Sequence, residues 1–328
     1  MTPILITVIV LALGFDFLNG IHDSSNVVAT MISSRAFSPR VALGSTALAN
    51  FIGPFLFGVA VANTIGHEVV DPQTITIEIV LAALISAILW NLLTWFLGFP
   101  SSSSHALIGG IVGAVAMGAG WQEIQMHGLY HVLIPLFTSP LIGFVIGFAL
   151  LKIIIGLSWA ATPRINEVFK RSQIVTGLAL ALSHGTNDSQ KTMGIITMAL
   201  VTAGVLDKFV VPLWVILACA TMIALGTAVG GWRLIRTLGG KIFKIRPVDG
   251  FASQLASAAV IITASLIGGP VSTTQVVSSA IMGAGTAQRA SKVRWGVAQE
   301  IALAWVLTIP ASAVFAAIIC WILVRIIH

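Results

Sequence analysis

The chain alternates between long apolar runs and short polar stretches. Six runs are apolar almost throughout, and they cover about residues 41–65, 75–97, 129–152, 209–232, 250–268 and 298–325. Four more contain polar residues, glycine or proline, and they cover about residues 4–35, 98–120, 173–206 and 269–288. A helix of about 20 residues crosses a hydrocarbon core of about 30 Å. The pattern therefore predicts an all-α polytopic membrane protein with about ten membrane-crossing segments.

One polar stretch occurs twice in the chain. Residues 19–26 read NGIHDSSN, and they align without a gap with residues 184–191, which read HGTNDSQK. Asp23 then meets Asp188. Each stretch has a glycine as its second residue, and glycine lets a chain leave helical geometry. Backbone groups freed at membrane depth must face a cavity or a ligand, so we expect both segments to be broken helices that line a site.

A second motif is also duplicated. Residues 98–105 read GFPSSSSH, and they align without a gap with residues 268–275, which read GGPVSTTQ. Two motifs in the same order, at nearly the same offset, predict an internal duplication. We place the first repeat at 1–160, a linker at 161–172 and the second repeat at 173–328.

The proline-hydroxyl motifs suggest an anion site. Proline suits the first turn of a helix, and the free N–H groups and dipole of a helix N-terminus attract anions. We therefore expect re-entrant segments in which two helices start opposite each other, with hydroxyl groups that bind a small oxyanion. The candidate anion ligands in these motifs are Ser101, Ser102, Ser103, Ser104, Ser272, Thr273 and Thr274.

Composition and charge fix the class and the orientation. The chain is 57% hydrophobic and only 9% charged, so it cannot cover a soluble surface. Its net charge of +6 comes without a dense basic run, so we expect no nucleic-acid partner. Most Lys and Arg fall in alternate loops, and these loops are predicted to be cytoplasmic. Both termini are then extracytoplasmic. An odd number of crossings in each repeat makes the second repeat inverted, which is typical of secondary transporters.

The two pairs of motifs resemble those of the inorganic phosphate transporter (PiT) family, bacterial type, in order and over essentially the whole chain. The resemblance implies a cell (inner or plasma) membrane symporter, without enzymatic activity or cofactor, that takes up phosphate with a cation and forms a homodimer in the lipid bilayer. It also implies that the proline-hydroxyl motifs hold the anion. The residues that it assigns to the coupling cation are Asn19, His22, Asp23, Asn26, Asn187 and Asp188. Sulfate permeases belong to the same family, so sulfate is the alternative substrate.

Departures from the family pattern concern the coupling ion. His22 stands where many relatives have Asn, and Lys191 stands where the first repeat has Asn26. Lys191 would replace one cation beside the anion, and His22 would carry a proton, because imidazole titrates near neutral pH. We therefore favour H⁺ over Na⁺. Sodium ions at Asp23 and Asp188 remain the alternative.

Other interpretations of these residues remain open. An intramembrane metalloenzyme could draw its ligands from His22, Asp23, His105, His184 and Asp188. The repeat places Asn187 opposite His22 and Gln275 opposite His105, which favours oxygen ligands instead. His105 and His184 could equally pack or form supporting hydrogen bonds, and Ser and Thr clusters could serve helix packing. Asp16 has no partner in the repeat, and we assign it a secondary role.

Overall fold

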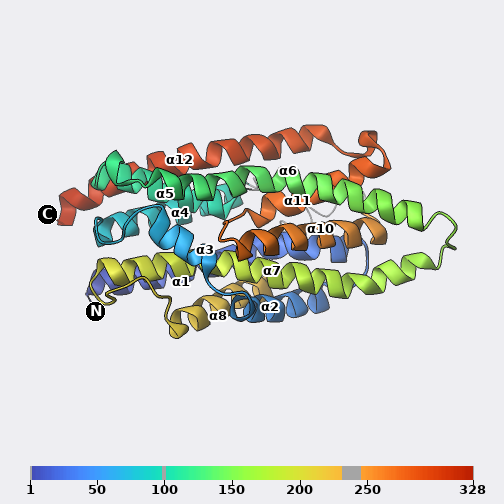
Figure 1. Cartoon of the computed structure of the whole chain (residues 1–328), viewed down its shortest axis with the longest axis horizontal. Coiled ribbons are helices and arrows are strands. Elements are labelled where there is room, and N and C mark those ends of the chain that lie inside the picture. Colours follow the sequence, from blue (N-terminus) through green and yellow to red (C-terminus); the bar gives the residue numbers. More distant parts are fainter. Residues whose placement is uncertain (1, 98–100, 231–244, 328) are drawn as a thin grey trace.

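The computed structural model describes residues 2–97, 101–230 and 245–327. These residues form an elongated bundle whose helices run mostly along its longest axis (Figure 1). The described ranges contain helices and turns, with a single isolated β-bridge between Val70 and Ile124. The start of α1 and the end of α12 lie at the same end of the bundle (Figure 1). The all-helical class predicted from the sequence is confirmed for these residues.

The long helices of the two halves follow the same order. The first half contains α1 (Pro3–Ser33), α2 (Pro39–Leu56), α3 (Ala60–Asn63), the π-helix η1 (Thr64–Glu68), α4 (Ile77–Leu97), α5 (Ser103–Gly118), the 3₁₀ turn η2 (Trp121–Glu123) and α6 (Met126–Leu157). The second half contains α7 (Ile165–Thr202), α8 (Leu213–Val229), α10 (Pro247–Leu266), α11 (Thr273–Gln288), the 3₁₀ turn η3 (Ala290–Lys292) and α12 (Trp295–Ile327). The first residues of α4 and α5 align with the first residues of α10 and α11 when the two copies of the second sequence motif are superposed.

Among the described residues, five helices are long and apolar enough to cross a membrane: α1, α4, α6, α10 and the Ile301–Ile326 part of α12. α2 and the Ala60–Glu68 segment would together form a sixth span, bent by 73°. α5 and α8 are apolar but shorter. α7 has 38 residues and falls outside these groups, since a polar motif occupies its middle. A helix can afford such polarity only where other helices cover it.

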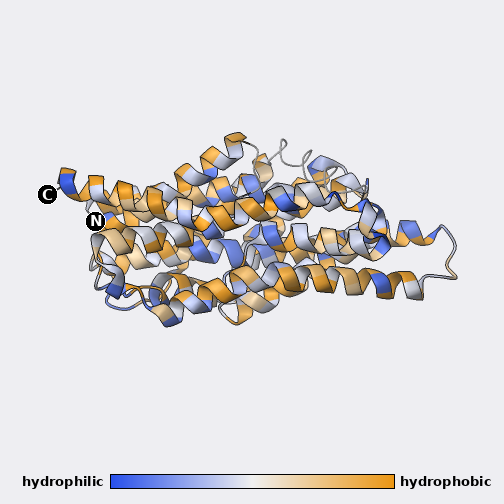
Figure 2. Cartoon of the chain, turned by 90° about the horizontal axis from the view of Figure 1, so that it is seen from above, coloured by the Kyte–Doolittle hydropathy of each residue, from blue (hydrophilic) through white to orange (hydrophobic). Residues whose placement is uncertain are grey.

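Many polar residues of the motifs are buried, and many large apolar side chains are exposed. Figure 2 shows hydrophobic residues along most of the helices, with hydrophilic residues in the middle of the bundle and at its ends. Phe96, Leu141 and Leu157 are among many large apolar side chains that are exposed. In contrast, Asp23, Lys191 and Gln275 are buried. This is the distribution expected of a bundle whose solvent is hydrocarbon.

The predicted breaks at the first motif are wrong. α1 continues through Asn19–Asn26 and α7 continues through His184–Lys191. The hydroxyl groups in α1 bond to the helix itself, because Ser24 Oγ donates to Ile21 O and Ser25 Oγ donates to His22 O, both at 2.7 Å. These side chains therefore belong to an intact helix, whose backbone groups form hydrogen bonds within the helix.

The two glycines of this motif serve helix packing. A Cβ atom on Gly20 would overlap Ile223 O of α8, and one on Gly185 would overlap Asn50 O of α2. Each glycine therefore lets two helices approach until backbones touch, which small residues allow in membrane bundles. The sequence shows the glycine but not the backbone that lies opposite. A glycine that breaks a helix and a glycine that lets two helices approach closely therefore cannot be distinguished from the sequence.

The second motif does interrupt a helix. α10 ends at Leu266 and α11 begins at Thr273, with Gly268 at φ +79° between them. Gln275 N donates to Ser272 Oγ at 3.4 Å and caps α11. The prediction that proline starts this helix is wrong, because Pro270 precedes the cap. Ser102 caps α5 in the same way, accepting from His105 N at 3.2 Å. Gly98, Phe99 and Pro100 lie outside the described residues.

Helices of the two halves pack against each other. α1 packs on α8, α2 on α7, α5 on α12 and α6 on α11. A Cβ on Gly113 of α5 would overlap Ala313 O of α12, and one on Gly283 of α11 would overlap Phe144 O of α6. Gly113 and Gly283 are equivalent when the two copies of the second motif are aligned. The same kind of close contact thus recurs in both halves, and neither half buries its helices alone.

We predict that Gly20→Ala lowers the stability of the bundle by about 1–3 kcal/mol, because α1 and α8 must separate. Gly14→Ala is the matched control in the same helix, since a Cβ there has no neighbour within 4 Å. Alanine at that position should leave stability unchanged or raise it by up to about 1 kcal/mol. Thermal unfolding of both purified variants in detergent measures the difference. Equal melting temperatures would refute the packing role of Gly20.

Candidate functional site

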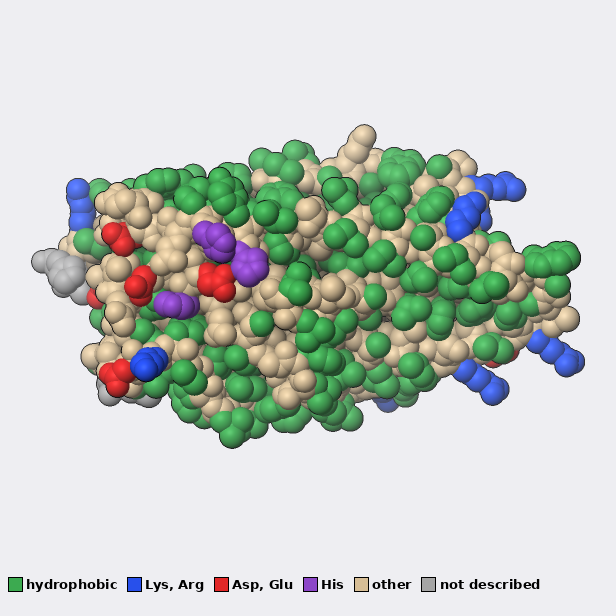
Figure 3. All heavy atoms as spheres, in the orientation of Figure 1, with side chains coloured by type: hydrophobic (Ala, Val, Ile, Leu, Met, Phe, Trp, Pro, Cys, Tyr) green, Lys and Arg blue, Asp and Glu red, His purple; other side chains and the backbone are tan. Residues whose placement is uncertain are grey.

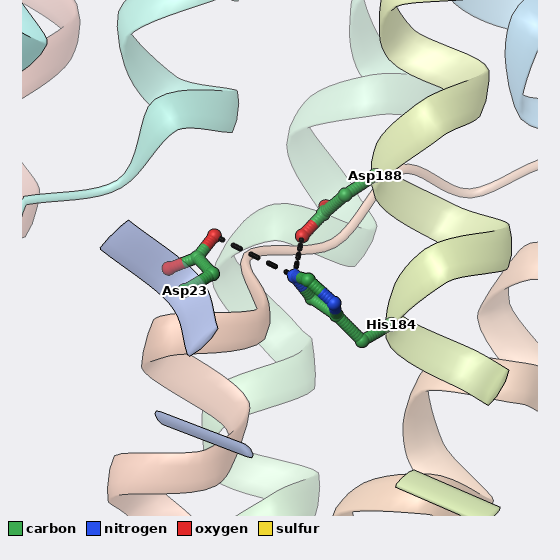
Figure 4. Close-up of side chains that lie close together, drawn as sticks. All are labelled: Asp23, His184 and Asp188. Atoms are coloured by element: carbon green, nitrogen blue, oxygen red, sulfur yellow. Dashed lines mark ion pairs between the residues drawn. The ribbon is translucent and has the colours of Figure 1, made fainter. Parts of the chain in front are cut away.

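Two carboxylates and an imidazole meet where α1 crosses α7. Asp23 comes from α1, and His184 and Asp188 come from successive turns of α7, with all three buried. Figure 4 shows the imidazole of His184 between the two carboxylates. Its Nε2 atom lies 2.9 Å from Asp188 Oδ2 and 3.9 Å from Asp23 Oδ2. One donor atom from each residue lies within 4.8 Å of the others, so the group could hold a metal ion.

A chain of hydrogen bonds orients His184. Thr227 Oγ1 donates to Ile223 O at 2.8 Å and accepts from Asn50 Nδ2 at 2.8 Å. The amide oxygen of Asn50 then faces His184 Nδ1 at 3.0 Å, so Nδ1 is the donor. Nε2 faces the carboxylates. Acceptors on both sides of the ring are the environment that a protonated imidazole requires.

Lys191 lies one turn further along α7 and is 1% exposed. Its ammonium forms an ion pair with Asp188 Oδ1 and donates to Ser104 Oγ at 2.5 Å and to Val271 O at 2.8 Å. These three bonds use all three protons of the ammonium. Lys191 therefore ties α7 to the first turn of α5 and to the break between α10 and α11.

Both carboxylates accept hydrogen bonds from the first turn of α11. Thr273 Oγ1 donates to Asp188 Oδ2 at 2.9 Å, and Thr274 Oγ1 donates to Asp23 Oδ1 at 2.6 Å. Asn26 Nδ2 also contacts Asp23 Oδ1 at 2.7 Å and Thr274 Oγ1 at 2.8 Å. The hydroxyl groups that the sequence assigns to an anion are thus within bonding distance of the residues that it assigns to a cation.

One arrangement occurs twice within this cluster. Asn26 follows Asp23 by three residues and contacts both Asp23 and Thr274. Lys191 follows Asp188 by three residues and contacts both Asp188 and Ser104. Ser104 and Thr274 occupy the same position in the two copies of the second motif. In each case a donor on α1 or α7 bridges a carboxylate on its own helix to a hydroxyl group from the opposite half.

The remaining predicted residues lie around the cluster or apart from it. Asn187 holds the break, because its Nδ2 donates to Ser265 Oγ at 2.8 Å and its Oδ1 accepts from Val271 N at 3.2 Å. His22 stacks on Trp95 at 6.1 Å between ring centroids and forms no ion pair with Asp23 or Asp188 within the described chain. Asn19 lies one turn before Asp23 and makes no hydrogen bond through its side chain within the described chain.

The first proline-hydroxyl motif contributes unequally. Ser104 reaches Lys191, whereas Ser101 Oγ lies 2.6 Å from Thr94 Oγ1. Ser102 caps α5 and lies 2.8 Å from His105 Nδ1. Ser103 is half-buried in the first turn of α5. The structure therefore brings only one of these four serines into contact with the charged cluster.

Sequence reasoning missed Asn50 and its support. Asn50 is buried in α2 and is 134 residues away from the histidine that it orients. Its only sequence signal is an amide within an apolar helix, which is a reason to suspect function in a membrane protein.

The structure also reduces the number of candidate metal ligands that the sequence offers. His105 contacts Ser102 and Gln275, and His22 contacts Trp95, so three of the five candidates remain together.

Similar proteins point in one direction. A sequence model described as the phosphate transporter family matches residues 19–316. A relative from Bacillus subtilis (strain 168), named "Probable low-affinity inorganic phosphate transporter", is 46% identical over 322 residues, which cover 97% of this chain and 96% of the relative. A relative of the same name from Rhizobium meliloti (strain 1021) is 45% identical over 318 residues, which cover 96% and 95%.

A solved structure named "The sodium-dependent phosphate transporter" shares the fold. Its TM-score to this chain is 0.89, the sequence identity is 24%, and the match covers 100% of both chains. At this identity the likeness concerns the fold alone. It supports the helical arrangement described above.

We predict that the ion pair between Lys191 and Asp188 behaves as a coupled unit. Lys191→Met leaves a buried carboxylate without its cation and should cost about 3–5 kcal/mol of unfolding free energy. Asp188→Asn should be costly for the converse reason. The double variant removes both charges, so its cost should fall well below the sum of the two. Denaturation of the purified variants in micelles measures the cycle, and additive costs would contradict the pairing.

Proposed function

The chain belongs to the phosphate transporter family, and from this premise we propose that it takes up inorganic phosphate together with a cation by alternating access. The family predicted from the sequence motifs is confirmed. So is the expectation of a multi-pass membrane transporter that is not an enzyme, since the relatives are named as transporters. The observation that carries the proposal is the cluster of two carboxylates, an ammonium and hydroxyl groups buried in an apolar bundle.

The proposed anion site joins Lys191 to the hydroxyl groups of both proline-hydroxyl motifs. Ser104, Thr273 and Thr274 already converge on this region, and the first turn of α11 adds free N–H groups beside Ser272. A phosphate oxygen would accept bonds that Lys191 and Thr273 now give to Asp188. Ser101, Ser102 and Ser103 stand further out in this proposal, at the start of α5. Displacement of Asp188 from its donors would prepare it to receive a cation or a proton.

Coupling is proposed through the two carboxylates and His184. Imidazole between Asp23 and Asp188 can take up a proton when phosphate binds and release it when phosphate leaves. His184 fits this role better than His22, which faces Trp95. Sodium at Asp23 and Asp188 is the alternative, and the name of the structural neighbour speaks for sodium in that protein. We favour protons, because Lys191 already supplies a fixed positive charge beside Asp188.

Alternating access is proposed to rest on an inverted repeat of about ten membrane-crossing segments. The repeated bridge of Asn26 and Lys191 supports the repeat. Figure 3 shows most of the visible Lys and Arg side chains at one end of the molecule, and most of the visible Asp, Glu and His side chains near the other. The basic end would face the cytoplasm and both termini the outside of the cell membrane. A homodimer is proposed from the family resemblance.

Phosphate is proposed as the substrate over sulfate, because the two relatives are named for inorganic phosphate. Hydroxyl groups and an ammonium serve both oxyanions. Phosphate also accepts protons near neutral pH, and a carboxylate pair with an imidazole is suited to exchange them. Excess unlabelled sulfate should therefore leave labelled phosphate uptake nearly unchanged, whereas excess unlabelled phosphate should abolish it.

We predict that uptake by reconstituted protein follows an inward proton gradient. Proteoliposomes should accumulate labelled phosphate above its external concentration when the lumen is alkaline, with choline replacing sodium. A protonophore should abolish this accumulation. Accumulation that needs an imposed sodium gradient and ignores the proton gradient would contradict proton coupling and support sodium at Asp23 and Asp188.

We predict that Asp23→Asn and Asp188→Asn each abolish accumulation against a gradient. Both side chains accept hydrogen bonds from α11, and an amide cannot exchange a proton or balance a cation. Glu78→Gln is the control, because Glu78 is a buried carboxylate in the first turn of α4, outside the cluster. Accumulation should be measured in proteoliposomes that contain equal amounts of folded protein. Normal accumulation by both Asp variants would refute the assignment of the site.

A further inference from the structure

A second polar group lies on α1, one to two turns before Asp23. Asp16 is 0% exposed and Asn19 is 1% exposed. They are three residues apart, so they share one face of the helix. Neither oxygen of Asp16 and neither polar atom of the Asn19 side chain has a hydrogen-bond partner among the described residues.

α7 carries two buried hydroxyl groups that also lack hydrogen-bond partners among the described residues. Thr192 interacts with Asp16 across the contact between α1 and α7, although its hydroxyl forms no hydrogen bond of normal geometry within the described chain. Ser189 precedes Thr192 by three residues, so it lies on the same face of α7, and its hydroxyl is also without a partner there. Both residues are buried.

No ion pair among the described residues would balance an ionised Asp16. Asp188, His184 and Lys191 act on Asp16 through space, but the described residues contain no ion pair with it. The ammonium of Lys191 is committed to Asp188, Ser104 and Val271. An unpaired buried carboxylate is very costly, and each unpaired amide or hydroxyl adds to that cost. Asp16 and Thr192 interact between the two helices, and Asn19 and Ser189 each lie three residues away on the same helix faces, an arrangement that indicates a ligand.

We propose that Asp16, Asn19, Ser189 and Thr192 bind a monovalent alkali cation of the sodium class, at a site separate from the cluster of Asp23, His184 and Asp188. The set offers a carboxylate, an amide oxygen and two hydroxyl oxygens, which are the ligands that hard cations prefer. One carboxylate balances one positive charge, whereas a divalent ion would leave an excess charge in the bundle.

A proton explains these residues less well than a metal ion. Protonation would neutralise Asp16 beside Thr192 but would leave Asn19 and the hydroxyl group of Ser189 without partners. An alkali cation takes oxygens from all four residues at once and links α1 to α7. The proposal that the ion binds rests on these four side chains. Only a role for the ion in coupled transport would rest on the proposed function.

Binding of ²²Na⁺ to the purified full chain in detergent, without phosphate and without a gradient, tests the site. The wild type should bind more ions per chain than Asp16→Asn, by about one ion. Asp23→Asn should retain the ion that Asp16→Asn loses, and Glu78→Gln should match the wild type. No sodium binding by the wild type, or equal binding by wild type and Asp16→Asn, would overturn the proposal.

Thr192→Val provides the second variant if Asp16→Asn fails to fold. It keeps the shape of the side chain and removes one oxygen, so sodium should bind at this site about ten- to a hundredfold more weakly. Sodium in place of choline should raise the melting temperature of the wild type more than that of this variant. Equal affinity and an equal rise would overturn the site. Sodium binding without phosphate uptake would refute the proposed function and leave the site standing.

Discussion

The ammonium of Lys191 fixes the geometry of the whole centre. A charge at this depth must be compensated, and the chain compensates it with Asp188, Ser104 and Val271, from three different segments. No one of the three can shift without leaving part of a buried charge unpaired. The positions of α5, of α7 and of the break before α11 are therefore linked. A ligand that draws Lys191 away from Asp188 changes the balance in all of them at once.

The centre combines two intact helices with interrupted ones, and each supplies what the other lacks. α1 and α7 satisfy their own backbones, so they can carry charged side chains without exposing peptide groups to hydrocarbon. The break between α10 and α11 has backbone groups that are not bonded within a helix, and side chains of the site bind them. Val271 N donates to Asn187, and Val271 O accepts from Lys191. Irregular backbone is tolerated at this depth because charged and amide side chains bind it.

Much of this centre could be predicted from the chain, and the errors have definite causes. The duplicated motifs identified Asp23, Asp188, Thr273 and Thr274, because polar residues are costly within an apolar membrane segment and are retained mainly where they have a function. Gly20 was misinterpreted because a sequence does not show which backbone lies opposite a glycine. Asn50 was missed because its partner is far along the chain, and no periodic pattern reports a contact of that kind. The direction in which His22 points depends on Trp95, which sequence spacing cannot supply.

The two halves bridge a carboxylate to a hydroxyl group with side chains of different charge. Asn26 bridges Asp23 to Thr274 with a neutral amide, whereas Lys191 bridges Asp188 to Ser104 with an ammonium. Asp188 is thereby neutralised by the chain itself, and Asp23 is left to His184 at a longer distance. The asymmetry between Asn26 and Lys191 therefore gives Asp188 a charged partner on its own helix, which a bound anion would have to draw away, whereas Asp23 has only the more distant His184.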